Sequence, residues 1–331
     1  MLRRIATRLT PEAAAFMPKR RANANPNPAR PAQRQKLGPL RNLRISSLTL
    51  RRYREHAWYF FYWITMIGVQ LASESELDQW VQDYIEQLWD HNAGLSAAQD
   101  TLAGVQHFMR QTVRLKGAWK LLGVWRRREP PTRAHPMPEF MVLGMAMHAL
   151  QAGDVHLCAS LLIGFFAYLR TGEIVNITFS QCIADSAGHL VLYLGQCKSG
   201  KRRGEEEFAI IDHAPVCSLL GIFCANRNPL DKVCGGEEYM WRRKFDRYLH
   251  NLGLSHLFLR PYSLRRGGAT AALRRGHTMA QTCSRGRWGN EKTARIYIQE
   301  AVSLLQKQVV SHTANAALIS LADSWCFDYL R

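Results

Sequence analysis

The chain has 331 residues, enough for two domains, because a single hydrophobic core rarely grows beyond about 250 residues. Its 44 lysines and arginines outnumber its 26 acidic residues, so the formal net charge is +18. This excess favours a polyanionic partner, since each phosphate that a protein neutralises releases condensed counterions. A negatively charged membrane surface and a basic protein without such a partner are the competing interpretations.

The composition disfavours several other classes of protein. The eight cysteines include no C-x-x-C pair, which indicates a reducing compartment rather than secretion. The twelve histidines form no H-E-x-x-H motif and no cluster with cysteine, so we expect neither a metal nor any other cofactor. The longest apolar runs, Tyr59–Val69 and Leu157–Leu169, fall short of the roughly 18–20 residues of a membrane span. We therefore expect buried helices and no membrane partner.

Residues 1–44 carry eleven Lys/Arg against the single acid Glu12. Such a segment buries too little apolar surface to offset its ordering entropy, so we expect a disordered basic tail. Four roles stay open for it: an arm that contacts DNA, a nuclear localisation signal around residues 19–21, an organelle transit peptide beginning MLRRIATRL, and a solvated tail without a role.

Residues 45–125 have the pattern of a small helical bundle. A first helix is expected from about Thr49, with four apolar residues directed toward a core, namely Tyr53, Trp58, Phe61 and Ile64. The capping-box signature Ser73-x-x-Glu76 predicts the start of a second helix. Ser96-x-x-Gln99 predicts a third, and the bundle should end near Trp125.

The proline-rich stretch 126–138 (RRREPPTRAHPMP) is the expected linker, because prolines break helices and favour extended backbone before them. The second domain, 139–331, should begin with a helix over 139–151 and continue with the apolar run that ends at Arg170. Three short strands are then expected, and everything from Glu237 onward has helical periodicity. The predicted strands are Ile177–Ala184, Leu190–Leu194 and Glu207–Ile211.

The segment Pro261–Tyr297 carries the most specific signal. Arg265 lies in a Leu-Arg-Arg-Gly-Gly sequence, Trp288 follows it by 23 residues, and Tyr297 follows Trp288 by nine. This spacing resembles the active site of the tyrosine recombinases, the phage-integrase family. The resemblance implies a mostly α protein with a small antiparallel sheet (α+β), in which a helical core-binding domain at 45–125 clamps DNA and residues 139–331 form the catalytic domain.

The stretch Phe166-Ala-Tyr-Leu-Arg170-Thr-Gly-Glu173 resembles the first conserved box of that family. A guanidinium suits this position because its planar fork can hold two phosphate oxygens at once. The alternative is that Arg170 only neutralises the carboxyl-terminal end of a helix.

Between the second and third predicted strands lies Gly195-Gln-Cys-Lys198-Ser-Gly-Lys201. In the family a lysine on such a hairpin protonates the departing 5′ oxygen, which implies that role for Lys198, with Lys201 as the second choice. A solvated basic hairpin that only touches phosphates is the alternative.

Tyr262-Ser-Leu-Arg265 resembles the family's second box, in which Arg265 would supply a second guanidinium. The family usually has His or Lys where this chain has Tyr262. A phenol, with a reference pKa of about 10, is a poor proton acceptor at neutral pH, although it can donate a hydrogen bond to phosphate.

Trp288 occupies the family's His-or-Trp position, where an indole N–H can donate to a phosphate oxygen. Tyr297 is the implied nucleophile, and Tyr329 near the carboxyl terminus is the second choice. Taken singly, both Trp288 and Tyr297 could be ordinary helix residues. Their joint spacing with Arg170 and Arg265 favours catalysis.

The resemblance implies a site-specific recombinase or integrase, of the kind that a mobile element encodes, that cleaves and rejoins DNA through a 3′-phosphotyrosine without metal or ATP. Two alternatives stay open: a non-catalytic DNA-binding descendant, motivated by Tyr262, and an enzyme similar to type IB topoisomerases. The implied partners are double-stranded DNA and further copies of the chain in a tetramer. The implied compartment is the nucleus of a eukaryote or the cytoplasm or nucleoid of a bacterium.

The carboxyl-terminal residues show two helical stripes on either side of a polar break at 311–315. We expect Ala301, Leu304, Leu305, Gln308 and Val309 to form one stripe, and Ala316, Ile319 and Ala322 to begin the other. In the family such a segment commonly docks on a neighbouring protomer, and we expect the same here, with packing on its own domain as the alternative.

Overall fold

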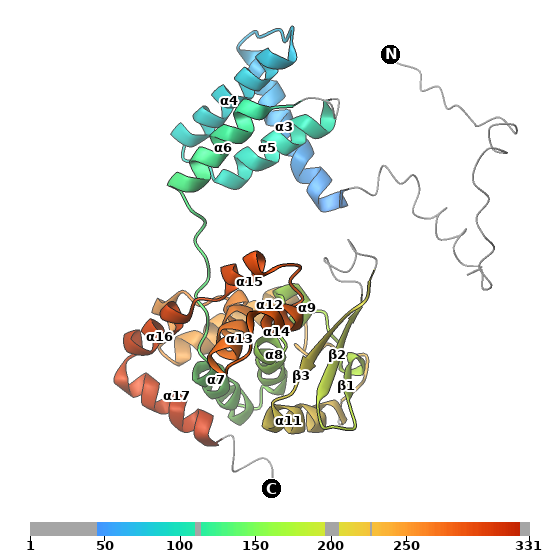
Figure 1. Cartoon of the computed structure of the whole chain (residues 1–331), viewed down its shortest axis with the longest axis vertical. Coiled ribbons are helices and arrows are strands. Elements are labelled where there is room, and N and C mark those ends of the chain that lie inside the picture. Colours follow the sequence, from blue (N-terminus) through green and yellow to red (C-terminus); the bar gives the residue numbers. More distant parts are fainter. Residues whose placement is uncertain (1–44, 110–113, 196–204, 226, 325–331) are drawn as a thin grey trace, which may run out of the picture. The chain divides into compact units, whose positions relative to one another are not determined.

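The computed structural model describes residues 45–109, 114–195, 205–225 and 227–324. The chain divides into two compact units, residues 1–131 (unit 1) and 132–331 (unit 2), shown in Figure 1. The described residues are mostly helical, with one three-stranded antiparallel sheet in unit 2, as the sequence predicts. The basic tail, Lys198, Lys201 and Tyr329 lie outside the described residues.

Unit 1 is a bundle of amphipathic helices in its described part. Its helices are α3 (Ser47–Met66), α4 (Glu74–Asp90), α5 (Leu95–Phe108) and α6 (Lys116–Arg128). The helix α3 packs on α5, and α4 packs on α6. The buried core is almost wholly apolar, and Phe60, Val81, Leu102 and Leu122 are among its members. Such a core gains its stability from apolar surface removed from water.

The helix starts in unit 1 match the sequence expectation in part. Ser73 is the N-cap of α4, and its Oγ accepts from the backbone N–H of Glu76 at 3.1 Å, as predicted. The expected cap at Ser96 was wrong, because Gly94 is the N-cap of α5 and makes no side-chain bond. The expected burial of Trp58 was also wrong: its side chain is 58% exposed, and Phe60 fills the core instead.

Unit 2 is built around a buried helix, α8. Its helices are α7 (Glu139–Gln151), α8 (Val155–Phe166), α9 (Thr171–Ile174), α11 (Ala214–Ala225), α12 (Glu238–Asn251), α13 (Tyr262–Arg274), α14 (Met279–Gly286), α15 (Glu291–Tyr297), α16 (Glu300–Val309) and α17 (His312–Ser324). Every residue of α8 from Leu157 to Phe166 is buried, as expected for a helix that is apolar on all sides. The neighbours of α8 include α7, α11, α12 and α13.

The sheet lies beside this helical core (Figure 1). Its strands, in the order β1–β2–β3, are β1 (Cys182–Ala184), β2 (Leu190–Gly195) and β3 (Glu207–Ile211). Leu192 pairs with Cys182 on one side and with Ala209 on the other. Alternate residues of β3 are buried, which turns the carboxylate of Glu207 toward the interior.

Two expectations for the sheet region need correction. The predicted strand Ile177–Ala184 is a strand only in its last three residues, because Phe179–Gln181 form a 3₁₀ turn and Thr178 makes an isolated bridge to Lys232. The helix α11, which follows β3, was not predicted.

The carboxyl-terminal helices also differ from the expectation. The predicted stripe on α16 is exposed in the single chain at Leu304, Leu305 and Val309. On α17 the buried residue is Leu318, rather than Ala316 or Ile319, and its backbone lies so close to Gly144 that a Cβ there would be 2.7 Å from the Leu318 carbonyl oxygen. In the single chain α17 packs on α7 of its own unit, as the alternative had it. Docking of this segment on a neighbouring protomer stays a prediction.

Candidate active site

The position of Arg265 depends on the two glycines that follow it on α13. A Cβ on Gly267 would lie 2.0 Å from the carbonyl oxygen of Met137, and a Cβ on Gly268 would lie 2.0 Å from that of Phe165. Only glycine allows helix α13 to approach the end of α8 and the start of unit 2 this closely. The Gly-Gly pair therefore seats α13 directly against the buried centre of unit 2.

The guanidinium of Arg265 is fully buried and is held by main-chain atoms. Its Nη1 donates to the carbonyl oxygen of Tyr168, and its Nη2 donates to that of Gly286 at 2.6 Å. The ring of Trp288 lies 4.7 Å from the guanidinium carbon. The Nε of Arg265 has no hydrogen-bond partner among the described residues. The cation is therefore fixed in direction and retains a donor for an anion.

Trp288 reaches this position through a left-handed turn at the end of α14. Arg287 has φ 56°, and the backbone N–H of Trp288 donates back to the carbonyl oxygen of Cys283 at 3.0 Å. The indole then folds over Gly286, where a Cβ would lie 2.0 Å from the ring. Gly286 thus serves twice, because it leaves room for the indole and its carbonyl holds Arg265.

Arg170 and Arg287 surround a buried carboxylate. Arg170 is the N-cap of α9, and both its backbone N–H and its Nη1 donate to Glu173, at 2.8 Å and 2.5 Å. Arg287 Nη2 donates to the same carboxylate at 2.5 Å, and its Nε lies 3.2 Å from Glu207 on β3. These ion pairs join α9, α14 and the sheet into one charged cluster.

The charges of this cluster favour an anionic ligand. Burial alone would raise the pKa of Glu173, but Arg287 and the backbone N–H of Arg170 hold it below its usual range. Burial lowers the pKa of Arg265, and the charges of Arg287 and Arg170 lower it further. Three guanidiniums therefore face two carboxylates, which leaves a positive excess that a phosphate would neutralise.

Tyr297, the last residue of α15, lies against this cluster. Its ring centroid is 4.7 Å from that of Trp288 and 5.4 Å from the guanidinium carbon of Arg265. The phenol of Tyr262 donates to the Tyr297 oxygen at 2.5 Å. The chain directly after Tyr297 is bonded to α13, because the backbone N–H of Gln299 donates to Thr270 Oγ1 at 3.3 Å. The phenol is therefore positioned from both sides.

The structure brings together five of the six residues that the sequence analysis singled out, namely Arg170, Tyr262, Arg265, Trp288 and Tyr297. Lys198, the sixth, falls between β2 and β3 in the sequence, outside the described residues. Sequence reasoning missed Arg287 and Glu207. Arg287 directly precedes Trp288, but the sequence Arg-Gly-Arg-Trp predicts neither a left-handed conformation at Arg287 nor a partner for it on β3.

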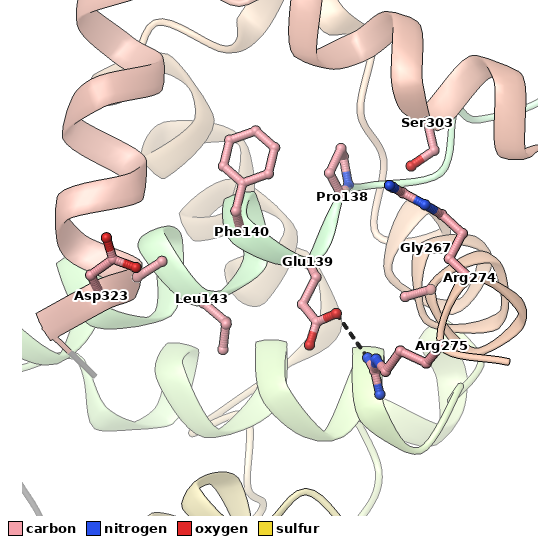
Figure 2. A pocket seen from close by; sticks show the side chains of 11 residues that line it. Pro138, Glu139, Phe140, Leu143, Gly267, Arg274, Arg275, Ser303 and Asp323 are labelled. Atoms are coloured by element: carbon pink, nitrogen blue, oxygen red, sulfur yellow. Dashed lines mark hydrogen bonds and ion pairs between the residues drawn. The ribbon is translucent and has the colours of Figure 1, made fainter. Parts of the chain in front are cut away.

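A cavity of about 460 Å³ lies elsewhere in unit 2, among residues of α7, α13, α16 and α17 (Figure 2). Arg275 and Glu139, which both line the cavity, form an ion pair with 2.9 Å between Nη2 and Oε2. The side chains of Phe140 and Leu143 give it an apolar side. None of the five clustered residues lines this cavity, so it is separate from the candidate active site.

The described residues include neither a metal site nor a membrane-spanning helix. No group of three or more His, Cys, Asp or Glu side chains is arranged to hold a metal ion there. No described helix is both long and apolar enough to cross a membrane.

No protein-family model matches the sequence, and no curated protein matches it either. Solved structures do match. A lambda integrase dimer bound to a COC′ core site matches with a TM-score of 0.52 and 14% identity, over 82% of this chain and 76% of the other. The XerH site-specific recombinase bound to difH substrate, in a pre-cleavage complex, matches with a TM-score of 0.51 and 14% identity, over 76% of this chain and 75% of the other. The chain therefore has the fold of the tyrosine recombinases, as its motifs predicted.

Proposed function

We propose that this protein is a site-specific DNA recombinase that cleaves and rejoins strands through a 3′-phosphotyrosine intermediate. The proposal rests on one juxtaposition: residues far apart in the sequence, Arg170, Arg265 and Trp288, meet around the phenol of Tyr297. A phenol beside fixed cations and a buried indole is suited to attack on a phosphodiester. The fold alone would not support this function, because one fold hosts many activities.

In the proposed reaction the oxygen of Tyr297 attacks the phosphorus of the scissile phosphate. The new bond joins this oxygen to phosphorus, and the bond to the 5′ oxygen breaks, which leaves a 3′-phosphotyrosine and a 5′ hydroxyl. Arg265 and Arg170 stabilise the negative charge that develops on the non-bridging oxygens. The buried indole N–H of Trp288, which lacks a partner of good geometry, is a further donor. Attack by the 5′ hydroxyl of a second strand reverses the chemistry and rejoins the DNA.

The departing 5′ oxygen needs a proton, because an alkoxide is a poor leaving group. Lys198 fills this role in the proposal, and Lys201 is the second choice. Both precede β3, whose first residue, Glu207, faces the ion-pair cluster through Arg287. Strand β3 thus begins at the cluster, and the two lysines shortly precede this strand in the sequence. This supports a hairpin lysine as the acid.

DNA is the proposed partner. The two neighbouring structures were solved on DNA, XerH on its difH substrate and lambda integrase on a COC′ core site. The net charge of +18 provides the electrostatic attraction. Recombination between two duplexes also requires several active sites, so we propose assembly into a tetramer on DNA, with residues 45–125 as the domain that clamps the duplex.

The decisive experiment is covalent trapping. The protein is incubated with sheared genomic DNA from its source and denatured, and the DNA retained on protein is sequenced. Fragments that share one sequence are expected, and they supply a nicked suicide substrate for quantitative assays. Tyr297→Phe should bind this substrate nearly as well as the wild type but form no adduct.

The variants and readouts separate the rival functions. An adduct that persists in Tyr297→Phe and disappears in Tyr329→Phe would move the nucleophile to Tyr329. Specific binding without any adduct would identify a non-catalytic descendant, and relaxation of supercoils without strand exchange would identify a topoisomerase. Affinity should also fall by about 10³–10⁵ between 50 and 200 mM salt if about 6–10 phosphates are contacted.

A further inference from the structure

The contact between Tyr262 and Tyr297 gives the proposed nucleophile a partner. Tyr262 is the first residue of α13 and Tyr297 the last of α15, and their oxygens lie 2.5 Å apart, with Tyr262 as the donor. The ring centroids are 5.6 Å apart, at an interplanar angle of 49°. The tilted rings therefore meet through their hydroxyl groups.

Tyr262 is held in place independently of Tyr297. The start of α13 is tied down by Ser263, whose carbonyl oxygen accepts from the backbone N–H of Met137 at 3.1 Å. The Oγ of Ser263 accepts from the backbone N–H of Arg260 at 3.0 Å, and the side chain is fully buried. The backbone next to Tyr262 is therefore fixed by contacts that do not involve Tyr297.

The surroundings decide which of the two phenols keeps its proton. Charged or hydrogen-bonding groups face Tyr297 from every element packed against it: Arg170, Tyr262, Arg265, Arg266 and Trp288. Burial would raise the pKa of Tyr297, but the bond from Tyr262 and the charges of Arg265 and Arg170 lower it. Burial and the bond to Tyr297 raise the pKa of Tyr262. The surroundings thus favour the phenolate of Tyr297 over that of Tyr262.

We propose that Tyr262 is a catalytic residue that acts on the nucleophile instead of the phosphate: it donates its hydrogen bond to the Tyr297 oxygen, aims that oxygen and stabilises its phenolate. This inference rests on the proposed function. The O–H bond of Tyr297 breaks and its proton passes to bulk water. The phenolate electron pair then forms the bond to phosphorus, and Tyr262 keeps its own proton throughout. Tyr262 is therefore an adapted part of the site.

The first test measures the ionisation of Tyr297 without DNA. The full-length protein is labelled with ¹³Cζ-tyrosine, the Tyr297 resonance is assigned by its loss in Tyr297→Phe, and its shift is followed against pH. A hydrogen bond to a charged group is worth about 1.5–3 kcal/mol, so Tyr262→Phe should raise the pKa of Tyr297 by about one to two units. Tyr248→Phe, which removes another buried phenol of unit 2, should leave it unchanged.

The second test is the pH dependence of adduct formation on the suicide substrate. In Tyr262→Phe the pH at which the cleavage rate rises should increase by the same one to two units. At any pH below this rise, cleavage should be about tenfold slower for each unit of the shift. Tyr262→His keeps a hydrogen-bond donor and should fall between the wild type and Tyr262→Phe. Far-ultraviolet circular dichroism and thermal unfolding check that each variant is folded.

The outcomes separate the two proposals. If Tyr297 titrates at the same pH in the wild type and Tyr262→Phe, or if Tyr262→His cleaves faster than the wild type, the role of Tyr262 proposed here is wrong. If the titration shift appears but no DNA yields an adduct, the phenol pair stands and the recombinase function fails.

Discussion

The two units of this protein have different cores. In the described part of unit 1 the buried side chains are apolar apart from Thr101. In unit 2 the fully or nearly fully buried side chains include three charged ones, Glu207, Arg265 and Arg266. Apolar residues of similar volume would stabilise such positions at least as well, because burying a charge carries a large desolvation penalty. Stability therefore explains the buried guanidiniums of unit 2 poorly, and the proposed binding of a phosphate would account for them.

The largest expected effect concerns catalysis. Arg265→Ala should slow adduct formation on the suicide substrate by about 10²–10³-fold or more, since one preorganised donor to a developing charge is worth about 3–4 kcal/mol. Arg242→Ala removes the same charge from an exposed pair with Glu238 on α12 and is the matched control. Equal rates in the two variants would mean that the buried cation of unit 2 does not act on the phosphate.

The next effect concerns stability. Arg287→Met removes the guanidinium faced by Glu173 and Glu207, two carboxylates whose side chains are only 8% and 3% exposed. Breaking a buried ion pair from one side costs about 3–5 kcal/mol, and denaturant unfolding should detect this loss. Adding Glu173→Gln to this variant should recover part of it. A cost no larger than that of Arg242→Met, about 0–1 kcal/mol for an exposed pair, would contradict the charged-core description.

Unit 1 should respond as an ordinary apolar core. Leu102 is fully buried in it, and Leu102→Ala should lower the free energy of unfolding by about 2–5 kcal/mol because it leaves a cavity. Hydrogen exchange read by mass spectrometry should show faster exchange in α3 and α5, with unchanged protection in α8 and α13. Matched loss of protection in both units would show that the two cores unfold together.

The smallest expected effect is a dependence on acid pH. The pKa of Glu173 is lowered in the folded state, so its stabilising contribution is complete above its unfolded value of about 4.3. This contribution is lost as the pH falls through the lowered folded value. The stability difference between the wild type and Glu173→Gln, measured by denaturant unfolding, should therefore narrow in acid. A difference that stays constant down to acid pH would assign the effect of Glu173 to packing.

Sequence patterns were most reliable where a local signal settles the structure. The helix α7 has the predicted bounds, and Ser73 caps α4 as its spacing indicated. The pattern failed on α3, which carries apolar side chains on more than one face, so that periodicity alone could not choose between Trp58 and Phe60. The unpredicted helix α11 is a short apolar run, and such runs fit a strand or a helix equally well.

The candidate site shows the same division. Arg170, Arg265, Trp288 and Tyr297 were accessible from the sequence because their spacing resembles that of a family. Arg287 was not, because its role depends on a positive φ and on a carboxylate that comes from a strand 80 residues earlier in the numbering, at Glu207. Contacts of this kind are set by tertiary structure and leave no local pattern.

The carbonyl oxygens that hold Arg265 have a consequence for sequence divergence. Both anchors, at Tyr168 and Gly286, are main-chain atoms, which every amino acid carries. Related chains could therefore replace the side chain at residue 168 and still orient the same guanidinium, provided that the turn there keeps its left-handed conformation, with φ 50° in this chain. An active site held by main-chain atoms can be retained while much of the surrounding sequence changes. Comparison of backbone structures then detects the relationship more readily than comparison of sequences.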